Sequence, residues 1–287
     1  MSRNTLWLVP TEMKTELVTP KKWQPELETY VGWLRAAGRP KGTIQLRVYH
    51  LRRFAVRSGC DPFDVTLDDL VHHLADNDWG AHTRRSVRAS LRVFYNWAHA
   101  TGRVTVNHAA LLPSVPVPLG KPRPAGDAAV LVGMNARDDR VPVMVALAAR
   151  AGLRCCEIAT VHARDITGTR HSRLLRVVGK GSRVRMIPLA DDLATLILER
   201  AQGGWLFPGK IDGHLSAGYV SKLISWALPG DTTAHPLRHR FASRAYKGSG
   251  NNLRAVQELM GHASIATTQI YTAVDDDDLR HAALSAA

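Results

Sequence analysis

A proline-rich segment near the middle of the chain limits what the chain can fold into. Residues 113–124 read Pro-Ser-Val-Pro-Val-Pro-Leu-Gly-Lys-Pro-Arg-Pro, with five prolines in twelve positions. Proline has no backbone N–H and a fixed φ, so this stretch is excluded from helix interiors and central strands and should run extended. With 287 residues the chain is also long for one small core. We therefore predict two domains, joined by these residues as a semi-rigid linker.

The first half of the chain has the apolar periodicity of amphipathic helices, with apolar residues at i, i+3, i+4 and i+7. Helices are predicted over about 24–37, after Pro40, after the capping residue Thr66, and over about 81–100. In the last of these the predicted core face consists of Val87, Leu91, Phe94, Tyr95 and Ala98. Residues 21–112 are therefore predicted to form a helical domain, with residues 1–20 as an N-terminal extension.

Three arginines repeat every four residues on another side of the last of these helices, at Arg84, Arg88 and Arg92. Like charges at this spacing destabilise an isolated helix by a few tenths of a kcal/mol per pair. The stripe therefore favours an anionic partner lying alongside the helix. A solvated basic face in an arginine-rich protein is the alternative, and the stripe alone fits both.

The charge of the whole chain also favours an anionic partner. Its net charge is +13, from 38 Lys and Arg against 25 Asp and Glu. Residues 21–115 carry 14 basic and 8 acidic residues (+6), and residues 121–287 carry 22 and 15 (+7). Such an excess favours a polyanionic partner, either nucleic acid or an anionic membrane surface. The apolar run Leu6–Val9 is cut by Pro10 and is too short for a signal peptide or membrane span, which leaves nucleic acid.

The second half of the chain combines helical patterns with one alternating stretch. Helices are predicted over about 127–134, 139–151, 190–201, 216–228, 235–248 and 252–260. Between Arg173 and Leu189, β-branched residues alternate on both sides of Gly-Lys-Gly-Ser, which is typical of a two-stranded hairpin with Lys180 at its tip. The predicted fold class is mainly α with a small antiparallel β-sheet in the second domain.

Four separated motifs in the second half carry residues suited to phosphate chemistry. They are Arg154 in Ala-Gly-Leu-Arg-Cys-Cys-Glu-Ile, where a turn enters a helix; Lys180 in the hairpin; His235-Pro-Leu-Arg238-His at a helix start; and Gly261-His262 shortly before Tyr271. Each motif alone has an ordinary explanation, such as a surface arginine, a turn residue or a helix C-cap. Their joint occurrence in this order reverses that interpretation, because independent explanations would have to coincide.

The order and spacing of these motifs resemble the tyrosine recombinase (phage integrase) family, across the whole chain in outline and over about 140–275 in motif detail. The resemblance implies a helical, SAM-like core-binding domain, the linker, an α+β catalytic domain at 125–275 and a tail at 276–287. It also implies a site-specific recombinase that cleaves and rejoins DNA through a 3′-phosphotyrosine intermediate and a Holliday junction, in a tetramer.

The chemistry of opening a phosphodiester without metal or cofactor explains this set of residues. A phenol has a pKa of about 10 and needs cationic neighbours or a base before it attacks, which is the situation expected for Tyr271. Arg154 and Arg238 are expected to clamp the phosphate, because a guanidinium matches two phosphate oxygens and stays charged. By resemblance, the other members are Lys180 as general acid toward the 5′ oxygen, His235 as general base, His262 as a second hydrogen bond to the phosphate, and Glu157 and His239 as supporting residues.

Two features depart from the family pattern. Ala273 stands where a His or Lys often follows the tyrosine, and Asp275–Asp278 places four carboxylates close behind Tyr271. The acidic run is expected to face a partner protomer or solvent, because members of this family generally exchange C-terminal segments around a tetramer.

About twenty residues precede the first helix, which is too few for an additional arm-binding domain.

The type of recombinase stays open between two interpretations. We favour an integrase of a phage or mobile element, and an Xer-type resolvase of chromosome or plasmid dimers is the alternative. A catalytically inactive DNA-binding relative would lack members of the site, but all six are present. A type IB topoisomerase would share the chemistry without a defined target site, and a structural role predicts neither the clamp nor the tyrosine.

The expected partners are double-stranded DNA with core-type attachment sites, other protomers and, for an integrase, a directionality factor. DNA contacts beyond the catalytic residues are expected at Arg84, Arg88, Arg92, Lys121 and Arg123. The C-terminal Ala286-Ala287 resembles tags that bacterial proteases recognise, and a frayed tail is the alternative. Three cysteines without framework spacing, Cys60, Cys155 and Cys156, favour a reducing cytosol. The resemblance implies the cytoplasm of a bacterial host, near its nucleoid. No metal, cofactor or membrane contact is expected.

Overall fold

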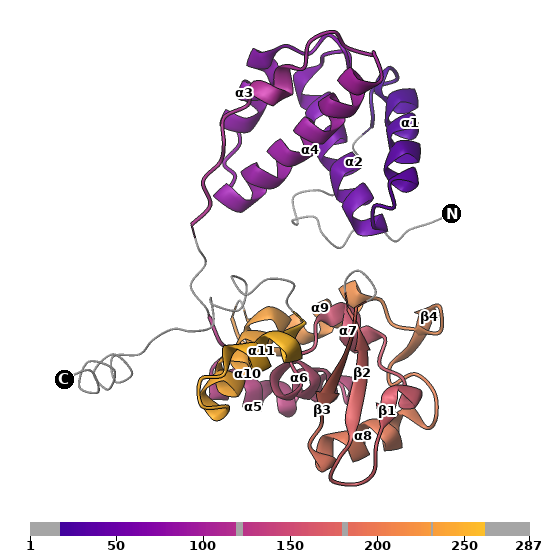
Figure 1. The fold of residues 1–287 in the computed structure, drawn as a ribbon, viewed down its shortest axis with the longest axis vertical. Coiled ribbons are helices and arrows are strands. Elements are labelled where there is room, and N and C mark those ends of the chain that lie inside the picture. The colour runs from indigo at the N-terminus through magenta and orange to yellow at the C-terminus, as the bar shows by residue number, and fades with distance from the viewer. Residues whose placement is uncertain (1–17, 119–122, 180–182, 231, 262–287) are drawn as a thin grey trace, which may run out of the picture. The chain divides into compact units, whose positions relative to one another are not determined.

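The computed structural model describes residues 18–118, 123–179, 183–230 and 232–261 (Figure 1). The chain forms two compact units, Met1–Pro118 and Leu119–Ala287, so that the division falls inside the proline-rich segment. Outside the described residues lie Lys121, Lys180, His262, Tyr271, Asp275–Asp278 and Ala286-Ala287.

The first unit is helical throughout its described part. Its helices are α1 (Trp23–Ala36), α2 (Lys41–Ser58), α3 (Leu67–Ala75), α4 (Ala81–Ala100) and the short 3₁₀ helix η1 (His108–Leu111). The α-helices agree with the predicted ranges to within one residue, and η1 was not predicted. Helix α3 begins as expected at Thr66, whose hydroxyl accepts from the backbone N–H of Asp69 while the Asp69 carboxylate accepts from the Thr66 N–H.

Aromatic side chains fill the core of this unit. Trp23 stacks on Phe94 with ring centroids 5.5 Å apart, and Tyr30 meets the edge of Phe94 at 5.2 Å. The Trp23 indole N–H donates to the Cys60 carbonyl at 2.9 Å, which satisfies the polar atom of a fully buried side chain. The whole predicted core face of α4 is buried, so the helical periodicity located the centre of this core correctly.

Two members of the α4 arginine stripe bind carbonyl groups within their own unit. Arg84 donates from Nε to the Leu74 carbonyl at 3.0 Å and from Nη2 to the Asn77 carbonyl at 3.2 Å. Arg88 donates from Nη2 to the Leu112 carbonyl at 2.7 Å. Both side chains are half-buried, which excludes the simple solvated face that was the alternative for them. Their contact with DNA stays a prediction.

Replacing Arg84 by Ala should lower the free energy of unfolding by about 1–2 kcal/mol, because two carbonyl groups lose their donor. The matched control is Arg85→Ala, since Arg85 is exposed on the same helix and its loss should cost less than about 0.5 kcal/mol. Urea unfolding followed by tryptophan fluorescence measures both. Equal effects of the two substitutions would show that the carbonyl contacts contribute nothing.

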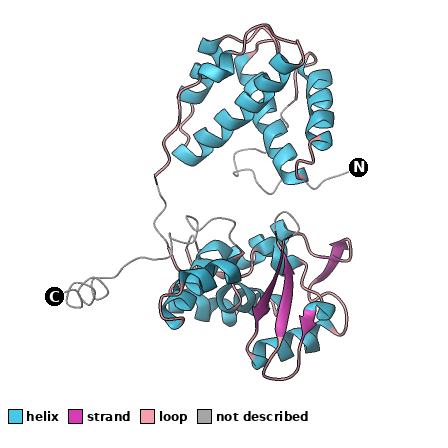
Figure 2. Ribbon diagram, viewed as in Figure 1, coloured by secondary structure: helices cyan, strands magenta, loops and turns pink. Residues whose placement is uncertain are grey.

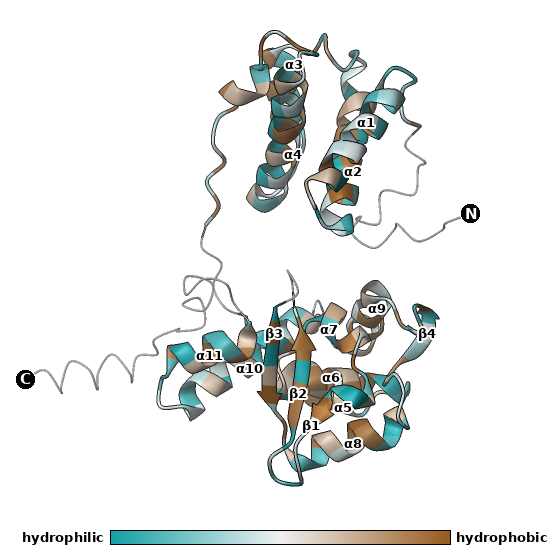
Figure 3. Ribbon diagram, turned by 45° about the vertical axis from the view of Figure 1, so that its right-hand side comes forward, coloured by the Kyte–Doolittle hydropathy of each residue, from teal (hydrophilic) through white to brown (hydrophobic). Residues whose placement is uncertain are grey.

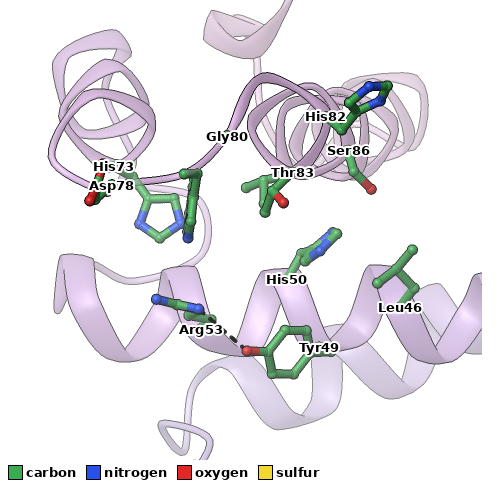
Figure 4. Close-up of a pocket in the computed structure, with 12 residues that line it drawn as sticks. Leu46, Tyr49, His50, Arg53, His73, Asp78, Gly80, His82, Thr83 and Ser86 are labelled. Carbon is green, nitrogen blue, oxygen red and sulfur yellow. Dashed lines mark hydrogen bonds between the residues drawn. The ribbon is translucent and has the colours of Figure 1, made fainter. Parts of the chain in front are cut away.

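A pocket of about 400 Å³ lies between α2 and the start of α4, and two buried histidines line it (Figure 4). His50 hydrogen-bonds through Nδ1 to the Ser90 hydroxyl at 2.9 Å. Burial, then the charges of Arg53 and Arg47, lower the pKa of His50 to about 4. Burial and the charges of Arg57 and Arg53 lower the pKa of His73 to about 4 as well. Both rings are therefore neutral near neutral pH.

These two histidines make the first unit sensitive to mild acid. Because the folded-state pKa lies below the unfolded value, the stabilisation is complete above about pH 6.5 and falls as the pH drops toward 4. Each histidine should remove about 2 kcal/mol of unfolding free energy between pH 7 and pH 5. In urea unfolding at both pH values, His50→Gln should show a smaller pH dependence than the wild type, whereas the exposed-site control His99→Gln should not. An unchanged pH dependence in His50→Gln would contradict the burial argument.

The second unit packs helices against a small sheet. Its elements are α5 (Asp127–Met134), α6 (Arg140–Arg150), α7 (Cys155–Ala159), η2 (Ala163–Asp165), β1 (Ile166–Thr167), β2 (Leu174–Val178), β3 (Val184–Pro188), α8 (Asp191–Ala201), β4 (Pro208–Ile211), α9 (Ala217–Ala227), α10 (Ala234–Gly248) and α11 (Leu253–Met260). The predicted helices and the hairpin are present to within about one residue. The sequence did not predict η2, β1 or β4.

The sheet is antiparallel, in the order β1-β2-β3 (Figure 2). Its central strand β2 is hydrophobic over most of its length (Figure 3), and Leu175 and Val177 are buried. Helix α6 is almost entirely buried and contacts α5, α7, α9 and α10. The helices and the sheet thus share one core, from which α7, α10 and β3 present the polar residues of the site.

The chain enters this unit through a contact with α10. The Ala125 N–H donates to the Pro236 carbonyl at 2.9 Å, and the Ala125 carbonyl accepts from Arg240 at 3.1 Å. Asp127, two residues on, pairs with Arg240 and with Arg244. The first residues after the linker are therefore held directly on α10. None of the described helices is both long and apolar enough to cross a membrane.

Candidate active site

A single buried carboxylate organises the charged residues of the second unit. Glu157, on α7, is 3% exposed, accepts hydrogen bonds from the side chains of two arginines and forms an ion pair with a third. Arg185 donates to it from both terminal nitrogens, at 2.8 Å each. Arg154 Nη1 donates at 2.9 Å, and Arg238 Nη1 lies 3.6 Å from Oε2. Elements far apart in sequence, α7, β3 and α10, therefore meet at this group.

The local structure of the chain explains how Arg154 and Glu157 meet. Gly152 adopts a left-handed φ of +66°, and a Cβ there would lie 2.3 Å from the Phe241 ring, so the turn before α7 admits glycine alone. Arg154 is the N-cap of α7, and its backbone N–H donates to Glu157 Oε2 at 2.8 Å. The carboxylate therefore caps the helix start from its first turn and holds the arginine at the same time.

The pKa of Glu157 reflects these contacts. Burial alone would raise it, but the hydrogen bonds from Arg185 and from the Arg154 backbone, with the charges of Arg185 and Arg238, lower it to about 2. The carboxylate is therefore ionised at any physiological pH. Three guanidinium groups face one carboxylate, which leaves two net positive charges at the site.

The two arginines predicted as a phosphate clamp differ in accessibility. The Arg154 side chain is 35% exposed. Arg238 is 3% exposed, and its guanidinium donates to the carbonyl groups of Gly152 and Met260. Arg154 is therefore accessible to solvent, whereas Arg238 is buried and hydrogen-bonded to carbonyl groups of the protein.

Two histidines lie at the start of α10 beside these arginines. His235 and His239 approach each other through their Nε2 atoms at 2.8 Å, with ring centroids 4.2 Å apart. Burial, then the charges of Arg238 and Arg154, lower the pKa of His235. Burial and the charges of His235 and Arg238 lower the pKa of His239 to about 4. Both rings are neutral near neutral pH, so His235 can accept a proton there.

Comparison with known proteins shows the family to which this chain belongs. Residues 133–278 match the phage integrase family. The tyrosine recombinase XerC of Methylobacterium sp. (strain 4-46) is 35% identical over an alignment of 297 positions. The alignment covers 89% of this chain and 91% of that protein. The chain belongs to the phage integrase family. It is a tyrosine recombinase, an enzyme that cleaves and rejoins DNA.

Further similarities agree with this family. The XerC of Chromobacterium violaceum is 36% identical over 233 residues, 74% of this chain and 77% of that protein. A lambda integrase dimer bound to a COC′ core site matches with a TM-score of 0.71 at 21% identity, over 88% of this chain and 77% of that chain. XerH bound to a palindromic difH substrate matches with a TM-score of 0.67 at 20% identity, over 90% of this chain and 83% of that chain. These structures confirm the predicted fold, mainly α with a small antiparallel sheet.

The described part of the recombinase brings together five of the eight predicted catalytic and supporting residues. Those that meet around Glu157 or at the start of α10 are Arg154, Arg238, His235 and His239. Lys180, His262 and Tyr271 lie outside the described residues. Gly179 and Gly261, which precede the first two of them, lie close to Arg185. A Cβ on Gly179 would lie 3.4 Å from Arg185 Nη1, and one on Gly261 would lie 3.2 Å from the same atom. Arg123 is exposed at the start of the unit.

Sequence reasoning missed Arg185. The signal was present: in an antiparallel hairpin, Arg185 alternates with Met186 and shares its face with the buried Ile187. An arginine on the inward face of a strand needs a buried partner, which here is Glu157. The described residues of the recombinase contain no cluster of three or more His, Cys, Asp or Glu side chains that could hold a metal ion.

Neutralising Glu157 should destabilise the recombinase strongly. Glu157→Gln leaves the buried Arg185 and Arg238 without their counter-charge, at a cost of about 3–5 kcal/mol. The control is Glu258→Gln, which removes the exposed ion pair with Arg254 and should cost less than about 1 kcal/mol. Urea unfolding monitored by circular dichroism measures both. A loss below about 1 kcal/mol for Glu157→Gln would mean that the cluster does not hold the unit together.

Proposed function

We propose that this recombinase is a site-specific integrase of a phage or mobile element, with Tyr271 as the nucleophile that becomes joined to a DNA 3′ phosphate. The observation that carries the proposal is the net positive charge of the cluster around Glu157, with Arg154 accessible to solvent. A phosphodiester at this position would supply the missing negative charge. The guanidinium fork of Arg154 matches two of its oxygens.

Each member of the site has a step in the proposed transesterification. The phenolic oxygen of Tyr271 bonds to phosphorus as the bond from phosphorus to the 5′ oxygen breaks. The phenolic proton passes to His235, which is neutral and beside the cluster, and Lys180 supplies the proton that the 5′ oxygen takes up. A 5′ hydroxyl of another strand then attacks the phosphotyrosine, which reverses these transfers and needs no metal or ATP.

The remaining residues have positioning and stabilising roles in this scheme. Arg154 and Arg238 stabilise the charge that develops on the non-bridging oxygens, and His262 adds a hydrogen bond to one of them. For Arg238 to do so, it must exchange at least one of its carbonyl partners for the phosphate. Glu157 and His239 orient the arginines and His235.

An Xer-type resolvase is the second candidate. Its support is the similarity to XerC proteins, among them that of Methylobacterium sp. (strain 4-46). The two candidates differ in substrate: a resolvase separates two copies of one site on a dimeric replicon, and an integrase joins two unlike sites. A plasmid assay with both arrangements separates them, because recombination confined to identical sites would contradict the integrase.

We also propose the partners that the chemistry requires. Several solved relatives are complexes with DNA, including the lambda integrase on a core site and XerH on difH. Double-stranded DNA with core-type sites is the partner that fits a chain of charge +13. Phosphate contacts at Arg92 and Arg123, and at Lys121, would add to those of the catalytic unit. Four further predictions remain untested. They are a synaptic tetramer, a directionality factor, cytoplasmic localisation near the nucleoid, and proteolysis through Ala286-Ala287.

The proposal is tested with a nicked suicide substrate that carries the attachment site. Wild-type protein should form a protein–DNA adduct that survives denaturation, and Tyr271→Phe should form none, whereas the control Tyr246→Phe, a half-buried tyrosine of α10, should form it normally. Arg154→Ala should slow adduct formation by about 10²–10³-fold while gel-shift affinity changes much less. An adduct from Tyr271→Phe would falsify the assignment of the nucleophile.

A further inference from the structure

Two arginines bind the last carbonyl groups of helix α11. The Leu259 carbonyl accepts from Arg185 Nε at 2.9 Å, and the Met260 carbonyl accepts from Arg238 Nη2. The final carbonyl groups of a helix have no partner within it and carry its partial negative charge, so cationic donors there are stabilising. Gly261 then ends α11 in the left-handed conformation, with φ of +61°. Figure 1 shows α11 beside α10 and close to β3, and α11 contacts both.

Arg185 is committed to these protein contacts. Its two terminal nitrogens bind Glu157 and its Nε binds Leu259, and the side chain is 10% exposed. Arg154, by contrast, uses one terminal nitrogen on Glu157 and keeps more than three times that exposure. The same carboxylate therefore holds one arginine that is accessible to solvent and one that is bound by protein groups. All three guanidinium nitrogens of Arg185 donate to protein acceptors.

The contact between Arg185 and α11 continues into the next residue. A Cβ on Gly261 would lie 3.1 Å from Arg185 Cδ and 3.2 Å from its Nη1, so the chain leaves the helix against this side chain. The sequence then runs through His262 to Tyr271, ten residues after Gly261. Arg185 thus links the arginine cluster to the C-terminal end of α11, at Leu259 and Gly261.

We propose that Arg185 is a positioning residue, which fixes the end of α11 relative to the Glu157–Arg154 pair and thereby sets where the chain begins its path to the nucleophile. This inference rests on the proposed role of Tyr271. Without the guanidinium, the Leu259 carbonyl loses its donor, and the bond from Arg238 to Met260 remains to hold the end of α11 to the cluster. The phosphate would still bind, but the attacking group would be held less closely to it.

A second route of action must be separated from this one. Arg185 lies on β3 and pairs in register with Val177, two residues before Gly179 on the strand that leads to Lys180. A substitution could therefore act through the general acid and not through α11. A 5′-bridging phosphorothiolate substrate distinguishes the routes, because a thiolate leaves without protonation and bypasses any defect in the acid.

The test uses Arg185→Lys, which keeps a positive charge near Glu157 but cannot bind both carboxylate oxygens and the Leu259 carbonyl. The matched control is Arg176→Lys, on the exposed face of neighbouring strand β2, where Arg176 pairs with Asp165. Arg185→Lys should reduce the single-turnover rate of adduct formation by about tenfold or more, with unchanged gel-shift affinity. Arg176→Lys should leave both unchanged.

On the phosphorothiolate substrate, Lys180→Ala should recover activity and Arg185→Lys should not. Recovery by Arg185→Lys would overturn the proposal in favour of action through Lys180, and a normal rate on both substrates would overturn it outright. If Arg185→Lys unfolds at markedly lower urea, Gly261→Ala perturbs the same contact from the other side and should give the same unrescued loss. An adduct from Tyr271→Phe would instead refute the proposed function, independently of Arg185.

Discussion

The catalytic unit depends on one carboxylate held under three guanidinium groups. Glu157 is buried and ionised, and burial of such a charge is tolerable because it is paired and fully hydrogen-bonded. One group thereby caps α7, anchors β3 and orients α10. Its arrangement leaves an excess of positive charge, so the interaction that holds the elements together also makes the site positively charged.

The helices of this chain could be predicted from sequence because each buries one face against a neighbour. The apolar period together with the cap Thr66 predicts where α3 begins, and the apolar period alone predicts where α4 begins; the structure agrees with both. Strand β1, of two residues, and strand β4, of four, are too short to carry a period that could be recognised. Such segments are strands because of what lies beside them, which is information that a local pattern lacks.

The sequence named residues that the structure brings together, but it did not indicate how they are arranged. The motif order named Arg154, Glu157 and Arg238, yet it did not indicate that Arg238 would be buried against the carbonyl groups of Gly152 and Met260. Arg185 was missed because its meaning depends on Glu157, 28 residues away in sequence. A charged residue on the inward face of a strand is interpretable only once its partner is known.

The junction between the linker and the catalytic unit has a mechanical consequence. Ala125, the first residue after the prolines, is hydrogen-bonded through its N–H to Pro236 and through its carbonyl to Arg240. Pro236 directly follows His235 and lies two residues before Arg238. A pull on the linker is therefore applied to α10 at the site itself. Within the described residues, Ala125 is bonded to α10 without an intervening loop, so a load on Ala125 reaches this helix directly.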